Sequence, residues 1–348
     1  MYVSAQILRG VAALCVVFYH VFGKKFGIHS LYVHPLAAGV DIFFIISGFV
    51  IFKSTENADR RAIFLARRIY RIAPIWFIAL TLWILYQHYG HGLSYPIGKI
   101  IKSYLFVFYA GDTPDDHGPI YGVGWTLNYE MLFYVLWGCV VMAVPSRYPR
   151  TRALVSLAIF TALIFSRVIF RPATGPWSVV ADYQNTVMWE FCAGSLIAAF
   201  EPQLKKIMSP PLGLALVVVG ILLLWAGDSY ARDLPRVIVF GAPAIMIFAG
   251  AIRTEKYAPK LGWLPRSLGD ASYSIYLIHP FPLEIGLVDT MALQNPVFQT
   301  WPALLLWSVV LTFISYLFYA GVERPINNYG KKLFRKKRKP PAEMLIRA

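Results

Sequence analysis

Long apolar runs recur along the whole chain, and charged residues gather mainly in the short connections between them. The runs approach the ~20 residues that an α-helix needs to cross the hydrocarbon core of a bilayer. A soluble core would account for one or two such runs, but not for a series that continues to the end of the chain. The pattern predicts an all-α, polytopic integral membrane protein with about ten transmembrane helices. The expected spans are 5–23, 36–52, 72–87, 125–144, 153–170, 186–200, 212–227, 236–252, 269–288 and 302–321.

A weaker apolar stretch, residues 97–110, carries Lys99 and Lys102. Charges are costly in the middle of a membrane, so this stretch is not counted as a span. It is expected to form an interfacial or re-entrant segment. If it crossed the membrane instead, the orientation of every later helix would be reversed.

The composition supports a membrane protein and excludes some other classes. Hydrophobic residues make up 57% of the 348 residues and charged residues only 15%, against about 25% in soluble proteins. The net charge of +15 would suggest nucleic-acid binding in a soluble chain, but here the basic residues lie in the connections between apolar runs, so no nucleic-acid partner is expected. The three cysteines, Cys15, Cys139 and Cys192, lie within apolar runs. They have neither disulfide-framework nor metal-ligand spacing, and no metal is expected.

The orientation follows from the placement of the lysines and arginines. Most of these 33 residues fall in every second connection and in the C-terminal tail, and the bias never reverses. Because cytoplasmic loops are enriched in such residues, both termini are predicted to be cytoplasmic. The first run contains Arg9 and has no basic segment before it, so it is interpreted as a retained helix. Residues 1–325 are expected to form one transmembrane domain, followed by a basic cytoplasmic tail, 326–348, that is attracted to anionic membrane lipid.

Two costly polar residues share the first span. Arg9 and His20 are eleven positions apart, which places them within about 20° of the same helix face and about 16 Å apart along the axis. Taken alone, Arg9 could extend its charge to the membrane surface and His20 could be a structural core histidine. Their common face favours a functional stripe, with Arg9 near the cytoplasmic end and His20 near the outer end.

Two carboxylates are expected at a depth similar to that of His20. Asp41 lies near the outer end of the second span, and Glu130 near the outer end of the fourth, in WTLNYE. A carboxylate partner would fix the tautomer of a catalytic histidine and stabilise its protonated form. Asp41 could instead act on a helix N-terminus, and Glu130 could pair with a polar neighbour. The sequence does not decide which of the two contacts His20.

Further polar groups lie in later spans. The ninth span reads LGDASYSIYLIHP and contains Ser272, Tyr273 and His279, and Glu190 lies in the sixth span. Buried histidine and glutamate side chains are often structural, and that interpretation stays open for both. Together with Trp125, which opens WTLNYE, these residues are the predicted substrate-binding residues.

A pair of arginines marks the cytoplasmic side. Arg68 and Arg71, in ARRIYRIAP, are three positions apart and share a face if the helix extends through them. Arginines at a helix entry suit phosphate binding, although they also fit the topology signal. With Arg9 they predict that a phosphorylated donor binds from the inside, while His20 removes a proton from an incoming hydroxyl further out.

The sequence resembles the membrane acyltransferase 3 family. Five blocks occur in the family's order: QILRGVAALCVVFYH, GVDIFFIISGFVI, RRIYRIAP, WTLNYEMLFY and SYSIYLIHPF. The sequences of the first, second and fourth blocks are most similar to the exopolysaccharide O-acetyltransferase branch. The resemblance implies ten spans, acetyl-CoA as the donor, and a hydroxyl of a polysaccharide or its lipid-linked oligosaccharide repeat as the acceptor. It also implies that His20 is catalytic, that Arg9 is its motif partner and that Arg68 with Arg71 binds coenzyme A.

The chain departs from the family at one position, because many members carry two adjacent glutamates where Glu130 is followed here by Met131. The expected function is transfer of acetyl from acetyl-CoA to an envelope glycan in the bacterial inner membrane, with a polysaccharide biosynthesis complex as a further partner. Three alternatives remain open: a transporter or flippase, a scaffold in such a complex, and the same enzyme with a succinyl or longer acyl group. No paired broken helices or internal repeat favour the transporter.

Overall fold

Every regular element in the described part of the chain is helical, which confirms the predicted fold class. The computed structural model describes residues 2–27, 29–30, 33–56, 61–109, 118–169, 184–230, 234–284 and 300–334. Seven helices in these ranges are long and apolar enough to cross a membrane. The first four contain α1 (Val3–Phe26), α2 (Ala38–Thr55), α3 (Arg61–His91) and α5 (Trp125–Ala143). The other three contain α6 (Pro149–Ile169), α10 (Pro210–Tyr230) and the continuous pair α15 (Trp301–Phe318) and α16 (Arg324–Leu333).

The three other predicted spans are shorter or broken. Residues 186–200 correspond to α8 (Met188–Ala199), whose 12 residues extend only about 18 Å. Residues 236–252 correspond to a π-helical turn, Val237–Gly241, that leads into α11 (Ala242–Arg253). The ninth predicted span, 269–288, covers the end of α12 (Trp263–Asp270), α13 (Ser272–Ile278) and α14 (Pro280–Glu284), and its residues 285–288 lie outside the described residues. The total of ten crossings therefore stays a prediction.

The stretch at 97–110 forms α4 (Ile97–Tyr104), an eight-residue helix that packs against α3. At 1.5 Å per residue it extends about 12 Å, which is too short to cross a bilayer. Only Ser103 of α4 is buried. A short helix at this place agrees with the interfacial or re-entrant segment expected from its two lysines.

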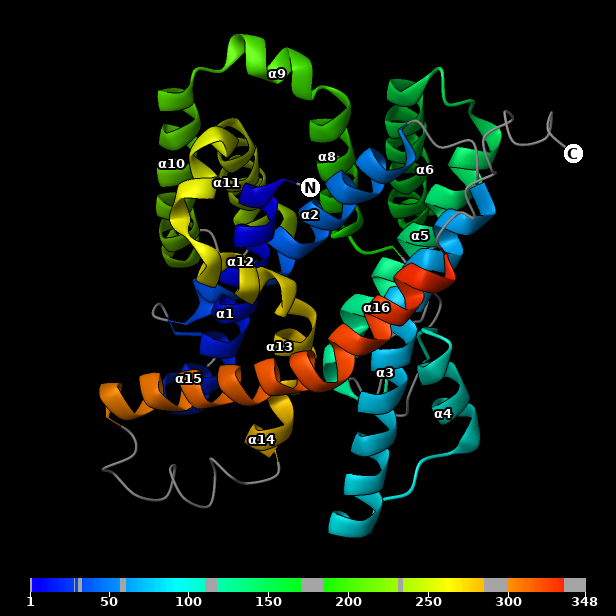
Figure 1. The fold of residues 1–348 in the computed structure, drawn as a ribbon, viewed down its shortest axis with the longest axis vertical. Coiled ribbons are helices and arrows are strands. Elements are labelled where there is room, and N and C mark those ends of the chain that lie inside the picture. Colours follow the sequence, from blue (N-terminus) through cyan, green and yellow to red (C-terminus); the bar gives the residue numbers. More distant parts are fainter. Residues whose placement is uncertain are drawn as a thin grey trace, which may run out of the picture.

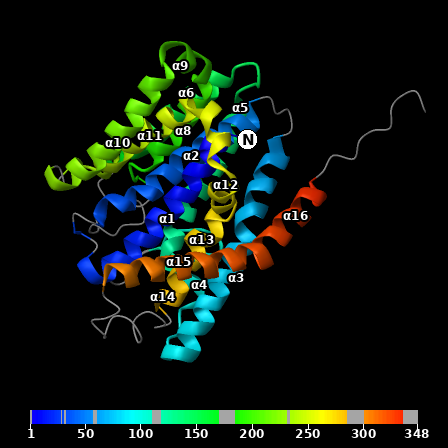
Figure 2. The same cartoon turned by 60° about the vertical axis from the view of Figure 1, so that its left-hand side comes forward.

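The helices form one bundle around α1 and α2 (Figure 1). On one side α2 packs against α8, and α10 pairs with α11; on the other, α3 packs against α5. The helix α15 runs across α1 and α13 at a steep angle, and α16 continues it past α3, as the turned view in Figure 2 also shows. The bundle thus gathers α1, α2, α3, α5 and α13 around a common centre.

Two glycines allow α2 and α8 to approach closely. A Cβ atom on Gly48 would lie 1.9 Å from the carbonyl oxygen of Phe191, and one on Gly194 would lie 1.9 Å from that of Ile45. No other residue fits at either position, so the two backbones touch, as small residues permit in membrane bundles. This contact fixes the part of α2 that carries Asp41 and Ser47.

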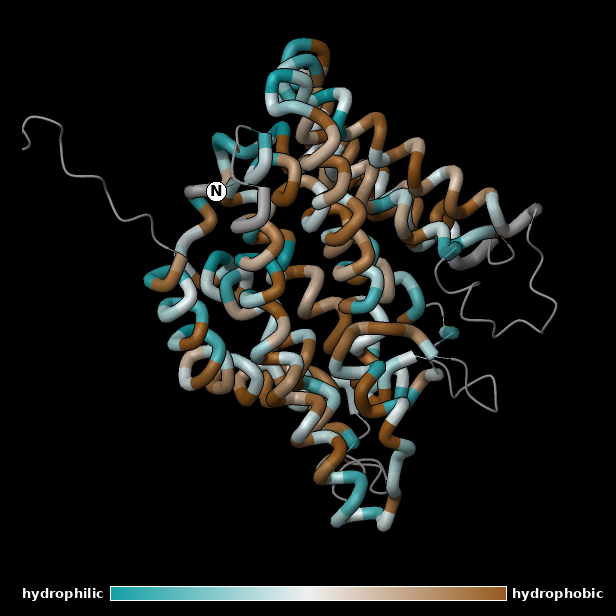
Figure 3. Tube along the Cα trace, turned by 90° about the vertical axis from the view of Figure 1, so that its right-hand side faces the viewer, coloured by the Kyte–Doolittle hydropathy of each residue, from teal (hydrophilic) through white to brown (hydrophobic). Residues whose placement is uncertain are grey.

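The periphery of the bundle differs in character from the connections between its helices. Large apolar side chains remain exposed on α10 and α15, such as Leu222, Leu306 and Val309, and apolar colouring follows the long helices in Figure 3. Exposure of this kind is expected where lipid replaces water.

Arg152, which the sequence interpretation counted only as a topology signal, is buried and donates to the carbonyls of Thr55 (2.7 Å) and Val144 (2.9 Å). It therefore joins the C-terminal ends of α2 and α5.

Candidate functional site

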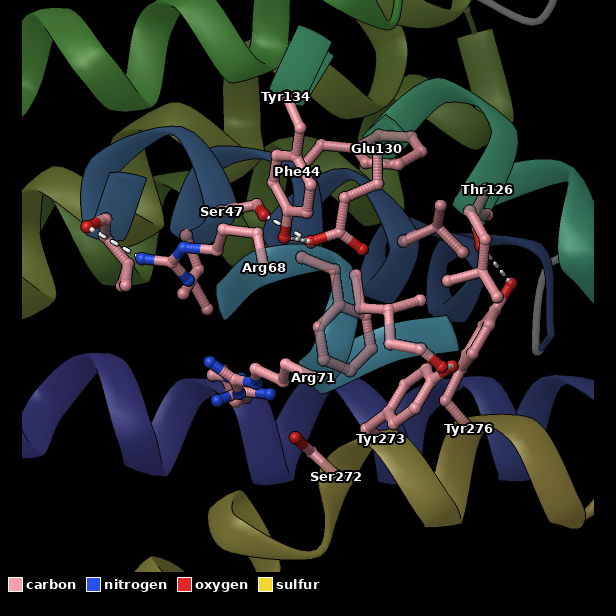
Figure 4. Close-up of a pocket in the computed structure, with 17 residues that line it drawn as sticks. Phe44, Ser47, Arg68, Arg71, Thr126, Glu130, Tyr134, Ser272, Tyr273 and Tyr276 are labelled. Atoms are coloured by element: carbon pink, nitrogen blue, oxygen red, sulfur yellow. Dashed lines mark hydrogen bonds between the residues drawn. The ribbon is translucent and has the colours of Figure 1, made fainter. Parts of the chain in front are cut away.

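A cavity opens between α1, α2, α3, α5 and α13 (Figure 4). Six of the predicted site residues line it, although they are distributed over most of the sequence. They are Arg9, Arg68, Arg71, Glu130, Ser272 and Tyr273. The remaining wall is largely apolar, with Phe43, Phe44 and Leu127 among its residues. Concave apolar sites with a few convergent polar groups are typical of ligand binding.

Arg9 and Arg71 come from α1 and α3 and lie close enough for their charges to interact. Neither guanidinium has a hydrogen-bond or ion-pair partner among the described residues. Glu323 interacts electrostatically with both, but its carboxylate oxygens accept hydrogen bonds from Ser274 and Asn327 instead. Two neighbouring guanidiniums carry ten N–H donors between them, and such a pair suits an anion with several oxygens.

Arg68 is held differently from the other two arginines. Its Nη2 donates to Ser54 Oγ at 2.9 Å, and its guanidinium carbon lies 5.6 Å from the centroid of the Phe64 ring. Part of its hydrogen-bonding capacity is therefore already used by the protein. Arg68 contributes charge at the cavity wall, while Arg9 and Arg71 offer more free donors.

Glu130 faces the same cavity from α5 and has partners of its own. It accepts hydrogen bonds from Ser47 Oγ of α2 at 2.6 Å and from the Tyr134 hydroxyl one turn further along α5. Figure 4 shows Ser47, Tyr134 and Glu130 converging above Arg68. The carboxylate is thus fixed next to the arginines, and its net effect is to reduce, without cancelling, the positive charge of the cavity.

The opposite wall is formed by α13. The Ser272 hydroxyl is fully buried and has no hydrogen-bond partner among the described residues, and it points into the cavity on the side of Arg71 (Figure 4). The Tyr273 hydroxyl donates to the carbonyl of Ile72 at 3.0 Å, and the Tyr276 hydroxyl lies 2.9 Å from Thr126 Oγ1. Ser272 is therefore the hydroxyl that remains available to a ligand here.

His20 and His279 form a separate contact outside the cavity lining. His279 Nε2 lies 3.2 Å from His20 Nδ1, and the ring centroids are 5.0 Å apart. Each Nδ1 also approaches the carbonyl one turn earlier on its own chain segment: Val16 for His20 and Ile275 for His279, both at 2.9 Å. His279 is fully buried and His20 partly exposed. Pro280 cannot continue the hydrogen-bonding of α13, so the helix ends just before His279.

Asp41 and Glu190 belong to a third group, centred on Arg236. Arg236 donates through Nε and Nη2 to the two oxygens of Asp41, at 3.1 and 2.5 Å, and Asp41 is fully buried. Glu190 interacts electrostatically with both, and its carboxylate lies against Gly241, where a Cβ would approach Oε1 to 2.9 Å. Both Glu190 oxygens are buried without a hydrogen-bond partner among the described residues.

The two carboxylates offered by the sequence as partners of His20 therefore have other hydrogen-bond partners. Asp41 binds Arg236, and Glu130 binds Ser47 and Tyr134. Trp125, the remaining predicted substrate residue, begins α5 and packs edge-on against Phe44 and Tyr129. It is not among the residues that line the cavity. Within the described ranges, no group of three or more metal-ligating side chains is placed to hold a metal ion.

The predicted site residues did not include Ser47, Tyr134, Tyr276 or Arg236. Tyr134 could have been found, because it stands four positions after Glu130 and so shares its helix face. Ser47 and Tyr276 lie inside blocks that had been recognised, FIISGF and SYSIYLIHPF, but hydroxyl residues are common there. Nothing near Arg236 in the sequence points to Asp41, which is 195 positions away.

Comparison with known proteins identifies the family. The acyltransferase domain family matches residues 2–320. The chain belongs to this family. Since the match covers nearly the whole transmembrane bundle, the predicted acyltransferase 3 membership is confirmed, and the cavity, the histidine pair and the Asp41 group all lie in this acyltransferase domain. No solved structure is significantly similar to the chain.

Three relatives indicate how similar this acyltransferase is to known proteins. The exopolysaccharide production protein ExoZ of Rhizobium meliloti is 30% identical, over 85% of this chain and 90% of its own length. The O-acetyl transferase of Shigella phage Sf6 is 26% identical over 82% and 83% of the two chains. The peptidoglycan O-acetyltransferase OatA of Listeria monocytogenes is 23% identical over 94% of this chain but only 56% of its own length. The family and these relatives confirm the prediction of an enzyme of the O-acetyltransferase type.

Proposed function

We propose that this acyltransferase transfers an acetyl group from cytoplasmic acetyl-CoA to a hydroxyl of an exopolysaccharide or another envelope glycan, or of its lipid-linked repeat, at the bacterial inner membrane. The observation that carries the proposal is the pair of guanidiniums, Arg9 and Arg71, which line a cavity and have no hydrogen-bond or ion-pair partner among the described residues. The two charges repel each other, so an anionic ligand stabilises the site. The phosphates of coenzyme A supply such an anion, and the exopolysaccharide production protein and the O-acetyltransferases among the relatives support a glycan acceptor.

In this mechanism the phosphates of acetyl-CoA bind Arg9 and Arg71, with the Ser272 hydroxyl as a further donor. His20 acts as the general base. The acceptor hydroxyl gives its proton to His20 as its oxygen attacks the acetyl carbonyl, the carbon–sulfur bond breaks, and the coenzyme A thiolate takes the proton back from His20. A positioned histidine of this kind accelerates proton transfer by about 10²–10⁴-fold.

The donor part of the proposal is tested by binding to the purified protein in detergent. Acetyl-CoA and S-acetylpantetheine share the thioester arm, but only the first carries phosphates. We expect much tighter binding of acetyl-CoA, and a smaller difference when Arg9 and Arg71 are both changed to alanine. Arg67→Ala is the matched control, because Arg67 lies on the same helix but donates to the carbonyl of Phe334 at 2.7 Å and not into the cavity. Equal binding of the two compounds to the wild-type protein would remove the proposed donor site.

The catalytic part is tested in cells. Mass spectrometry of surface polysaccharide, with and without this protein, shows whether acetyl groups depend on it. His20→Ala is expected to abolish that acetylation while the protein still inserts into the membrane at the wild-type level. Full acetylation by the variant would refute the role of His20, and loss of the polymer itself on deletion would favour a scaffold.

A further inference from the structure

We propose that His279 is a positioning residue that, together with the Val16 carbonyl, holds the N–H of His20 on Nδ1 and leaves His20 Nε2 as the basic nitrogen; the catalytic meaning of this rests on the proposed function. The observation is the chain of contacts from the Ile275 carbonyl through His279 and His20 to the Val16 carbonyl. It joins α13 to α1 across 259 positions of sequence.

The proton positions follow from counting donors. A carbonyl oxygen can only accept, so the 2.9 Å contact of His279 Nδ1 with Ile275 places the N–H of a neutral ring on Nδ1. His279 Nε2 then carries a lone pair. It faces His20 Nδ1, which also faces the Val16 carbonyl, and two acceptors around one nitrogen require that nitrogen to carry the hydrogen. A neutral imidazole has one N–H, so His20 Nε2 is the unprotonated nitrogen.

The arrangement gives His20 what a carboxylate gives the histidine of a hydrolase triad, namely a fixed tautomer and orientation. It does so without a second charge in the bundle, where a buried carboxylate would be costly. His279 is itself immobilised, because it is fully buried and its Nδ1 is tied to the backbone. When His20 Nε2 takes the proton of the acceptor hydroxyl, the His20 Nδ1–H bond to His279 persists and stabilises the cation.

The proposal is tested directly by nitrogen NMR of the full chain, labelled with ¹⁵N-histidine, in lipid bilayers at about pH 8.5, well above the ordinary histidine pKa of about 6.5. The His20 signals are assigned by their loss in His20→Gln. We expect His20 to be protonated at Nδ1 alone in the wild type and its Nδ1 resonance to shift in His279→Leu, where the Val16 carbonyl is the one of the two acceptors that remains. A wild-type His20 protonated at Nε2, or an unchanged His20 in His279→Leu, would overturn the proposal.

Kinetics add a readout that separates positioning from folding. The assay measures transfer of labelled acetyl from acetyl-CoA to polysaccharide isolated from cells that lack this protein. We expect His279→Leu to lower kcat about 10-fold or more with little change in the KM for acetyl-CoA, and His279→Gln, whose amide oxygen can accept in place of Nε2, to recover part of that loss. His88→Leu, at an exposed histidine of α3, is the control. Wild-type kcat in His279→Leu would overturn the catalytic part. The NMR result needs no turnover, so it decides the tautomer even if acetyl transfer itself is not found.

Discussion

Arg236 and Arg71 are arginines in the same apolar bundle, but their surroundings differ in one respect. Arg236 is matched by Asp41 through two hydrogen bonds, and a second carboxylate, Glu190, lies beside the pair. Arg71 stands next to another cation, Arg9, and neither has a hydrogen-bonding partner in the described part of the chain. A charge that the protein neutralises itself contributes to the architecture, whereas a charge left open at a cavity is available to a ligand. The difference favours a structural role for the first region and is consistent with the donor binding proposed for the second.

The largest expected effect is a loss of stability when the ion pair of Arg236 and Asp41 is broken. Arg236→Ala leaves Asp41 buried without its counter-charge, and loss of one partner of a buried pair costs about 3–5 kcal/mol. We expect a marked fall in the thermal unfolding midpoint of the detergent-solubilised protein. The exposed Arg147→Ala should leave that midpoint unchanged. A midpoint equal to wild type for Arg236→Ala would show that the pair does not stabilise the bundle.

The opposite result is expected in the cavity. Changing Arg9 and Arg71 together to alanine should weaken acetyl-CoA binding about 100-fold or more, because each arginine loses at least one charged hydrogen bond and each such bond costs about 1.5–3 kcal/mol. The unfolding midpoint without ligand should not fall, since the change relieves repulsion between two cations. Isothermal titration calorimetry and a thermal unfolding scan on the same samples measure both quantities. A large loss of stability with unchanged affinity would reverse the assignment of the two regions.

A smaller difference is expected within the arginine pair of α3. Arg68 already donates to Ser54, so Arg68→Ala should reduce acetyl-CoA affinity less than Arg71→Ala does. Titration of the two single variants, with Arg67→Ala as the control, makes the comparison. If Arg68→Ala were the more damaging change, the donor phosphates would lie nearer to Ser54 than to Arg9.

The smallest effect is expected at Glu201, outside the expected spans, at the start of α9 (Glu201–Ile207). Burial alone would raise the pKa of this carboxyl, but hydrogen bonds from Lys205, Tyr2 and Lys53 outweigh it and hold the pKa below its ordinary value. A carboxyl with a lowered pKa in the folded state contributes stability above its unfolded pKa, about 4.3, and loses that contribution as the pH falls through the folded value. Thermal scans between about pH 7 and pH 3 should therefore show Glu201→Gln differing from wild type near neutrality, by about 1 kcal/mol or less, and converging with it in acid. A constant difference would contradict the ion-pair explanation.

Sequence patterns predicted the helical elements well where the signal was local. The exclusion of residues 97–110 from the spans, the grouping of Arg9 with Arg68 and Arg71, and the polar character of α13 were all visible in spacing and residue type. The separation of Arg9 from His20 along α1 was also visible, because it follows from helix geometry alone. The predicted bounds of the spans were less accurate where a span is divided into short helices, as at Ala271 and Pro280. An apolar stretch of sequence does not reveal such breaks.

The sequence by itself determined that this chain is a helical membrane protein, because the length and apolarity of a segment decide whether it can reside in lipid. It also determined which polar and charged side chains are costly to place in lipid and are therefore expected to have a structural or functional role. Only the tertiary structure decided how those side chains are paired: Asp41 with Arg236, Glu130 with Ser47, and His20 with His279. Their pairing depends on how helices far apart in the chain cross one another, and that crossing is set by close contacts such as Gly48 against Phe191.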